Sequence, residues 1–476
     1  MCIWQVGSAG LRMPSTPFPV GWRNWLALSG RKDRESNMKQ FGNAKSIHNV
    51  GGFQRRRFLQ GAAALGTASA LGVRGAFAQS GETIKIGFIS PRSGPLAGFG
   101  EGDAFVLAQA RQALAAGLTI GGKSYAVEIL DRDTQSDPSR AAQLTNSLIN
   151  DDMVDIILAS STPETINPVS DACEAAGVPC ISTVMPWEAW YFGRGAKPGE
   201  PSPFKYTYHF GFGVGEFVKA YTAQWNLMDT NKKVGVLYPN DADGNAVRAV
   251  LAPQLEAAGF TVVDPGAYEN FTTDYSSQIA KFKAEGCEIF NSFALPPDFI
   301  TFWRQATQQG YTKTVKIAQV AKMGLFPSDI EAMGSLGANL SSAAYWHRSM
   351  PYSSPLTGAS ADQFAADYEA AEGRQWIQQI GASMSLIEVG VAALEASAAP
   401  KDRSVVAAAI AGLKTETIGG AVDFTSGPVP NVAHGPLFGT QWIAAEGGDY
   451  PFDYVVTENA TDPNVPVQME LKPYNG

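Results

Sequence analysis

The chain has 476 residues, of which 45% are hydrophobic and 17% charged, and its formal net charge is −9. This composition is typical of a globular protein, and the length is too great for one small core, so two domains are expected. The acidic balance argues against a nucleic-acid-binding protein, which needs a basic surface.

Residues 1–78 are interpreted as an N-terminal extension followed by an export signal. The stretch QRRRFLQ (54–60) has two adjacent arginines, one spacer residue, and then Phe and Leu, and a mild apolar run follows. That run has about 16 residues, fewer than the roughly 20 that a membrane span needs. Small residues at Ala76 and Ala78 then frame a cleavage site. We expect a twin-arginine signal that is cleaved after Ala78, with Met38 as the true start.

The protein that remains after this cleavage is strongly acidic. Removing residues 1–78 takes away 11 basic and 2 acidic residues and leaves 25 basic and 43 acidic ones, a formal net charge of −18. We see no later apolar run that approaches the length of a membrane span. No cysteine follows the cleavage site to carry a lipid anchor. These features predict a soluble protein of the periplasm.

Three cysteines follow the cleavage site, at positions 173, 180 and 287. An oxidising compartment permits disulfides. Cys173 lies late in an expected helix and Cys180 opens the next strand, so a bridge across the turn between them is geometrically plausible. The alternative is a pair of buried free thiols.

Strands and helices are expected to alternate from residue 82 onward. In the first part of the chain, strands are expected at 83–90, 125–133, 154–161 and 178–185, and helices at 103–116, 138–151 and 162–177. After about residue 210 the pattern restarts, with strands at 233–240, 260–268, 287–295 and 337–347 and helices at 244–259, 363–376 and 385–398. Several strands are short apolar runs without alternation, which indicates parallel sheets with helices on both faces.

This order predicts an α/β protein with two doubly wound parallel-sheet lobes. Lobe 1 is expected to contain residues 82–210, with 343–424 returning to it. Lobe 2 is expected to contain residues 211–342, with 425–476 returning to it.

Two stretches carry a specific resemblance to a known family. They are IGFISPRSGPLAGFGEG (86–102) and SSTPETINPVSDACEAAGVPCIS (160–182). With the export signal and the two lobes, they resemble the leucine/isoleucine/valine-binding protein family, whose members are periplasmic solute receptors of ABC importers. The resemblance covers residues 82–476. It implies a type I periplasmic binding protein with a multi-crossover hinge, a small-molecule ligand, and an ABC importer permease of the inner membrane as partner. The protein is expected to be a monomer.

Candidate ligand-binding residues in lobe 1 follow the strand ends, because open α/β sheets bind ligands at the carboxyl ends of their strands. Arg92 and Phe99 follow the first strand, and the family has an aromatic residue at the position of Phe99. Ser160, Ser161 and Thr162 follow the third strand at a helix start, where hydroxyls and amides together bind anions. The family holds the ligand carboxylate there, although simple N-capping is an equally good explanation for each residue.

The stretch PWEAWYFGRG (186–195) places a cluster of rings after the fourth strand, where Pro, Glu and Gly argue against a core element. In the family this loop passes over the ligand cleft near the first crossover. Trp187 and Trp190 are therefore predicted to be ring walls for a ligand. The alternative is that they seal the lobe or cover the crossover. Trp346 is a further candidate ring.

In lobe 2, Asp243 and Phe293 lie where the family has ligand-facing residues. Amino-acid binders of the family have an acidic residue near the position where this chain has Ala321 and Lys322. We expect no other acid within reach, although Asp243 is a possible substitute. The prediction is a small carboxylic acid with an aromatic or bulky apolar body and no free amine. The alternative is an amino-acid- or amide-binding receptor or sensor domain of the same fold.

Enzymatic chemistry is not expected. The histidines after residue 78 lack metal-ligand spacing, and no nucleophile elbow, Walker loop or dinucleotide motif is present. The stretch DRDTQSD (131–137) departs from a calcium loop at Gln135 and Ser136, and no Glu follows at the twelfth position. No cofactor or metal is predicted.

Overall fold

The computed structural model of the protein describes residues 81–474, so the predicted export signal and its cleavage site lie outside the described residues. The first sheet contains seven strands. In the order in which they pair, they are β14 (Val432–His434), β6 (Thr207–Gly211), β5 (Cys180–Thr183), β4 (Ile156–Ser160), β1 (Thr83–Ser90), β3 (Lys123–Asp133) and β2 (Leu118–Ile120). Neighbouring strands are parallel except for the β2–β3 pair.

The second sheet also contains seven strands. In pairing order they are β16 (Phe452–Val456), β15 (Phe438–Ala444), β11 (Leu340–Ala344), β10 (Ile317–Val320), β9 (Ile289–Ser292), β7 (Lys233–Leu237) and β8 (Thr261–Val263). Strand β15 runs antiparallel to both of its neighbours, and the remaining pairs are parallel. Each sheet with the helices that pack on it is called a lobe below.

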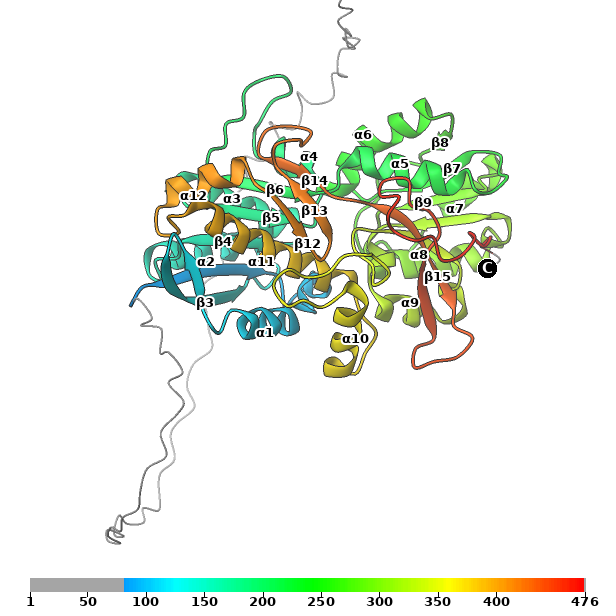
Figure 1. Ribbon diagram of the computed structural model, residues 1–476. Coiled ribbons are helices and arrows are strands. Elements are labelled where there is room, and N and C mark those ends of the chain that lie inside the picture. The colour runs from blue at the N-terminus through cyan, green and yellow to red at the C-terminus, as the bar shows by residue number, and fades with distance from the viewer. Residues whose placement is uncertain (1–80, 475–476) are drawn as a thin grey trace, which may run out of the picture. The chain divides into compact units, whose positions relative to one another are not determined.

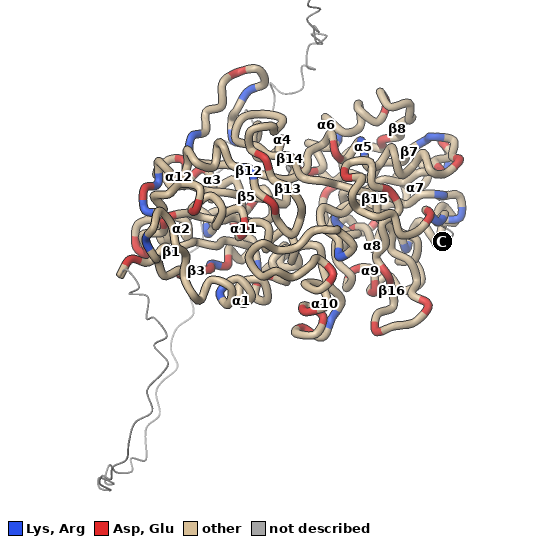
Figure 2. Tube along the Cα trace, in the orientation of Figure 1, with Lys and Arg blue, Asp and Glu red and all other residues tan. Residues whose placement is uncertain are grey.

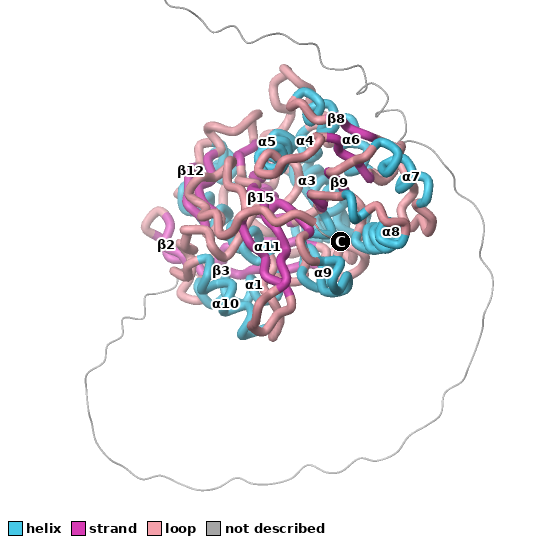
Figure 3. Tube along the Cα trace, turned by 90° about the vertical axis from the view of Figure 1, so that its right-hand side faces the viewer, coloured by secondary structure: helices cyan, strands magenta, loops and turns pink. Residues whose placement is uncertain are grey.

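Helices flank both sheets (Figures 1 and 3). The helices of the first lobe are α1 (Asp103–Ala113), α2 (Pro138–Asn150), α3 (Pro163–Ala176), α4 (Trp187–Tyr191), α11 (Gln378–Ser397) and α12 (Arg403–Ala411). Those of the second lobe are α5 (Val214–Trp225), α6 (Ala242–Ala257), α7 (Ser276–Glu285), α8 (Pro296–Gln308) and α9 (Pro327–Met333).

The remaining elements are a helix, a hairpin and four short 3-10 helices. They are α10 (Ala361–Glu372), the strands β12 (Lys414–Thr417) and β13 (Gly420–Asp423), and η2 (Ala97–Gly100), η3 (Thr312–Thr314), η4 (Lys322–Leu325) and η5 (Gly334–Gly337). The charged positions lie mainly in the outer loops and helices (Figure 2).

Local sequence explains why these elements form. All five residues of β4 are buried, as expected of an apolar strand that is covered on both faces. Helix α2 begins where the Asp137 carboxylate accepts the Arg140 amide at 2.8 Å and Pro138 takes the first helical position. Helix α3 ends at Gly177, whose φ of 66° suits glycine. The predicted α/β fold of two mainly parallel sheets is confirmed.

Helix α11 is mainly apolar, is buried over most of its length, and packs against β4 and β5 of the first sheet. Among the described residues, it is a helix long and apolar enough to cross a membrane, yet 83% of its most apolar window is buried inside the protein. The expectation that no run after residue 78 approaches this length was therefore wrong. Burial on all sides identifies α11 as a core helix of the first lobe.

The chain passes between the lobes three times. The connections run from β6 to α5, from β11 to α11, and from β14 to β15. The predicted assignment of 425–476 to the second lobe is wrong in one part, because β14 pairs with β6 in the first sheet. The strand has only three residues, Val432–His434, which is too short a pattern to indicate its partner.

The three cysteines of the described part are free thiols, and all are buried. The predicted Cys173–Cys180 disulfide is therefore not formed in the structure. Burial, and then the neighbouring Cys180 thiol, raise the pKa of the Cys173 thiol well above its ordinary value. The Cys173 and Cys180 thiols pack as small apolar groups in the core of the first lobe.

We expect all four cysteines of the chain to react with a thiol reagent after denaturation without reductant. In the native protein, Cys173, Cys180 and Cys287 should stay unreactive, because all three are buried. Spectrophotometric thiol counting measures both states. Only two reactive thiols after denaturation would show that Cys173 and Cys180 are paired.

Candidate functional site

Two buried hydroxyls stand at the end of β4, where α3 begins. Ser161 is 1% exposed and Thr162 is 6% exposed, and neither hydroxyl makes a well-formed hydrogen bond, although the Thr162 hydroxyl lies near enough to the Glu164 carboxylate to lower its pKa. Thr162 is the N-cap residue of α3, but its side chain makes no capping bond. The simple capping role considered for these residues is therefore not seen. Ser160, the last residue of β4, is also buried.

An unpartnered buried hydroxyl loses its bonds to water without gaining others, so such groups are normally found with a protein, water or ligand partner. Here two such hydroxyls lie at the N-terminus of a helix of 14 residues, the positive end of its dipole. This combination of hydroxyl donors and a positive helix end suits an anion.

An ion pair of the second lobe lies close to this helix start. Lys322 Nζ is 2.8 Å from Asp243 Oδ2. Burial lowers the pKa of Lys322, but the charges of Asp243 and Asp241 outweigh burial and raise it above its ordinary value. The lysine is thus charged and already paired, so the predicted cation candidate is neutralised by the predicted acid candidate.

Glu164, in the first turn of α3, links the two lobes electrostatically. Burial, and then the charge of Asp243, raise its pKa, while its own backbone amide, the Thr162 hydroxyl and the charge of Lys322 lower it to a smaller extent. The expectation that no acid besides Asp243 lies within reach was wrong, since Glu164 and Asp241 both act on Lys322. Glu164 belongs to α3 and Asp241 caps α6, so neither lies in the segment that carries Lys322.

Two rings meet between the lobes. Phe99, in η2 of the first lobe, packs edge-to-face on Phe326, which follows η4 of the second, with centroids 5.3 Å apart. A Cβ at Gly98 would lie 3.0 Å from the Phe326 ring, so glycine permits this approach. Sequence reasoning found Phe99 but missed Phe326, which lies beyond a strand end with no motif around it.

Arg92 does not serve as a free cation. Its guanidinium is 2.6 Å from Asp131 Oδ2, and its backbone amide donates to Asp133 Oδ1 at 2.9 Å. Burial raises the pKa of Asp131, but its bonds to Arg111 and Arg92 and their charges outweigh this effect and hold the pKa below its ordinary value. The residue thus fixes the turn after β1, which corrects its predicted role in ligand binding.

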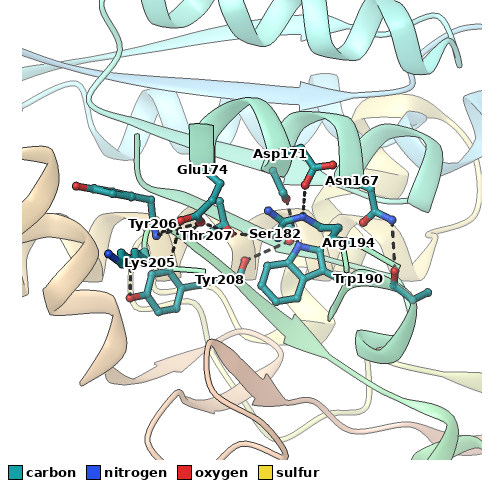
Figure 4. Close-up of polar contacts among 12 residues, drawn as sticks. Asn167, Asp171, Glu174, Ser182, Trp190, Arg194, Lys205, Tyr206, Thr207 and Tyr208 are labelled. Atoms are coloured by element: carbon teal, nitrogen blue, oxygen red, sulfur yellow. Dashed lines mark hydrogen bonds and ion pairs between the residues drawn. The ribbon is translucent and has the colours of Figure 1, made fainter. Parts of the chain in front are cut away.

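Trp190 lies in the core of the first lobe and corrects the prediction of a ring wall (Figure 4). It is fully buried, and its indole donates to Ser170 Oγ at 3.2 Å. The Arg194 guanidinium lies over the Trp190 ring at 4.8 Å and over Phe204 at 4.1 Å. Arg194 also binds Asp171 at 2.7 Å. The predicted loop is in part the short helix α4.

Trp187 lies against the first connection between the lobes. Its amide donates to the Phe212 carbonyl at 3.0 Å. A Cβ at Gly213 would lie 2.1 Å from its Nε1 atom, which is possible only with glycine. Covering the crossover was the alternative considered for the tryptophans, and this is what Trp187 does.

Phe293 is a core residue of the second lobe, whereas the ligand contact of Trp346 stays a prediction. Phe293 packs between Phe217 and Tyr238 in the second lobe. Trp346 is 1% exposed, and its indole donates to the Ile418 carbonyl at 3.1 Å. Its ring helps to line a cavity of about 40 Å³, room for a few water molecules. All three connections between the lobes contribute to this cavity.

Titratable groups elsewhere offer no metal centre. Within residues 81–474, no group of three or more His, Cys, Asp or Glu side chains is arranged to hold a metal ion. The carboxylates of the stretch 131–137 bind protein partners instead: Asp131 pairs with arginines, Asp133 accepts backbone amides, and Asp137 caps α2.

Two mainly parallel sheets joined by three connections make up the two-lobed fold of this chain. The chain belongs to the periplasmic binding protein family, whose model matches residues 83–464. Among curated proteins, Leu/Ile/Val-binding protein homolog 8 of Brucella suis is 26% identical over 246 residues, which cover 50% of this chain and 58% of the relative. The chain thus spans little more than half the length of this relative.

Solved structures show the same fold. The leucine-binding protein of Thermotoga maritima has a TM-score of 0.63 at 18% identity, over 79% of this chain and 99% of that one. The solute-binding protein of an ABC transporter from R. palustris, in complex with 4-hydroxybenzoate, has a TM-score of 0.63 at 20% identity, over 81% and 98%.

Replacing Trp190 with alanine should destabilise the protein by about 3–5 kcal/mol, since it removes a fully buried ring and leaves a cavity. Urea unfolding measures this loss. Trp187→Ala is the matched comparison and should cost less, because Trp187 is only partly buried. If both variants lost the same free energy of unfolding, the assignment of Trp190 to the core and of Trp187 to the crossover would be contradicted.

Proposed function

We propose that this protein is the periplasmic substrate-binding component of an ABC importer and captures a small carboxylic acid by closure of its two lobes. The observation that carries the proposal is the pair of unpartnered buried hydroxyls, Ser161 and Thr162, at the positive end of α3. A ligand carboxylate accepts hydrogen bonds from both hydroxyls, and the helix dipole favours its charge.

Closure follows from the position of this site. Asp243 and Lys322 of the second lobe act on Glu164 beside this site, so a ligand that contacts both lobes favours the closed arrangement over the open one. The Phe99–Phe326 ring pair offers flat apolar surface between the lobes. This favours a ligand with an aromatic or bulky apolar body. The R. palustris protein described above holds 4-hydroxybenzoate.

A second candidate is an amino-acid- or amide-binding receptor or sensor domain. It is favoured by the acids around Lys322, because Asp243, Asp241 and Glu164 exceed the single lysine in charge. Such surplus negative charge suits a ligand that carries an ammonium or an amide N–H. The Thermotoga maritima protein is described as leucine-binding.

Calorimetric titration of benzoate and cinnamate beside leucine, isoleucine and valine distinguishes the two candidates. We expect an aromatic acid to bind more tightly than the three amino acids. Ser161→Ala should weaken binding of the true ligand by roughly tenfold or more, the loss of one hydrogen bond to a charged group. Ser147→Ala, in the body of α2, is the matched control and should leave affinity unchanged.

Glu164→Gln gives opposite results for the two candidates. With an acid that lacks an amine, removal of this negative charge should raise affinity, whereas with an amino acid it should lower affinity. Tight leucine binding with no response to any aromatic acid would overturn the carboxylic-acid proposal. It would leave the solute-receptor role standing.

Export to the periplasm depends on the arginine pair at 54–60. Changing Arg55 and Arg56 to lysine should keep the protein in the cytoplasm, as cell fractionation with immunoblotting would show. N-terminal sequencing of exported wild-type protein should begin at Gln79. A start upstream of Arg55 in exported material would contradict the proposed signal.

A further inference from the structure

The short helix α4 of the first lobe holds the first residues of the second lobe. The Glu188 Oε1 atom accepts the Val214 amide at 2.9 Å, and Val214 is the first residue of α5. One position earlier on α4, the Trp187 amide donates to the Phe212 carbonyl. Two successive residues of α4, Trp187 and Glu188, therefore hold the connection from β6 to α5 by hydrogen bonds.

A second carboxylate continues this contact to the third connection. The Glu216 Oε2 atom accepts the Gly213 amide at 2.7 Å, which caps α5. Its other oxygen is 3.1 Å from Nδ1 of His434, the last residue of β14. The adjacent Gly435 amide donates to the Gly211 carbonyl at 2.8 Å. The two lobes are thus joined, at two of their three connections, by the side chains of Glu188, Glu216 and His434.

One carboxylate oxygen in this cluster lacks a hydrogen bond. The Glu188 Oε2 atom is buried and has no hydrogen-bond partner. A bare carboxylate oxygen is costly to bury when it is charged, and much less so when the group carries a proton. The charged groups that act on Glu188 come from other elements: Glu216 from α5 and His434 from β14.

We propose that Glu188, Glu216 and His434 form a proton-binding hinge, which holds the two lobes in the described arrangement when it is protonated and loosens when its protons are lost. With Glu188 neutral and His434 charged, the three groups sum to zero charge. After both protons leave, two carboxylates on opposite lobes face each other with no cation between them.

The pKa directions agree with this geometry. Burial raises the pKa of Glu188 to about 7, and the charge of Glu216 adds to the rise. The bond to Glu216 raises the pKa of His434 above its ordinary value of 6.5. Both groups therefore bind protons more tightly in the folded protein than in the unfolded chain. Their contribution to stability is greatest at low pH: that of Glu188 is lost as pH rises from 4.5 through about 7, and that of His434 is lost as pH rises above 6.5.

Hydrogen exchange with mass spectrometry tests the hinge in the full chain without ligand. We expect protection of the peptide around residues 212–217, corrected for intrinsic exchange, to fall at least tenfold between pH 6 and pH 8. Glu188→Gln keeps an acceptor for the Val214 amide but never ionises, so this variant should lose most of the pH response. His434→Gln removes the cation but leaves Glu188 protonated at pH 6, so this variant should show, at pH 6, a protection between the wild-type values at pH 6 and pH 8.

Glu388→Gln is the matched control. Glu388 is also buried, accepts one backbone amide, from Ile418 at 2.8 Å, and has one unpartnered oxygen. Burial raises the pKa of Glu388 to about 7 as well. Unlike Glu188, however, Glu388 joins α11 to the β12–β13 hairpin and lies outside the connections between the lobes. This variant should keep the pH response of residues 212–217. A wild-type protection that does not change with pH, or an unchanged response in Glu188→Gln, would overturn the proposal.

Discussion

The arrangement of the two lobes depends on the close backbone contact between the first and third connections. The Gly435 amide donates to the Gly211 carbonyl at 2.8 Å, and a Cβ at Gly435 would lie 2.9 Å from the Gly211 Cα atom. Gly211 has a φ of 153°, within the range that favours glycine. Two glycines therefore allow both connections to cross at one point, and α5 and β15 continue from it into the second lobe.

The layered fold was predictable because it follows from short-range sequence features. Fully apolar runs such as Ile156–Ser160 do not alternate, which predicts strands covered on both faces, and Pro138 and Gly177 mark helix ends. The assignment of β14 was not predictable. A three-residue strand carries too little pattern, and its place beside β6 is decided by the path of the chain through the hinge.

The candidate site was only half predictable, for a reason of the same kind. Ser161 and Thr162 were found because the strand end and the helix start lie within one stretch of sequence. The pairing of Arg92 with Asp131 depends on the register of β1 beside β3, and that of Lys322 with Asp243 on contacts between two strand ends. Residue type shows that a group can be charged, but only the fold shows which partner neutralises it.

The ring-rich stretch after β5, which contains α4, connects the core of the first lobe to the Glu188–Glu216–His434 hinge. A short helix of five residues cannot hold itself in place, since helix nucleation is unfavourable at this length. Trp190 anchors it in the first-lobe core, and Arg194 stacks over that ring and binds Asp171. With α4 fixed in this way, Glu188 on its other side is held where it meets the start of α5. The rings that seemed placed for a ligand thus provide the rigid support from which one lobe holds the other.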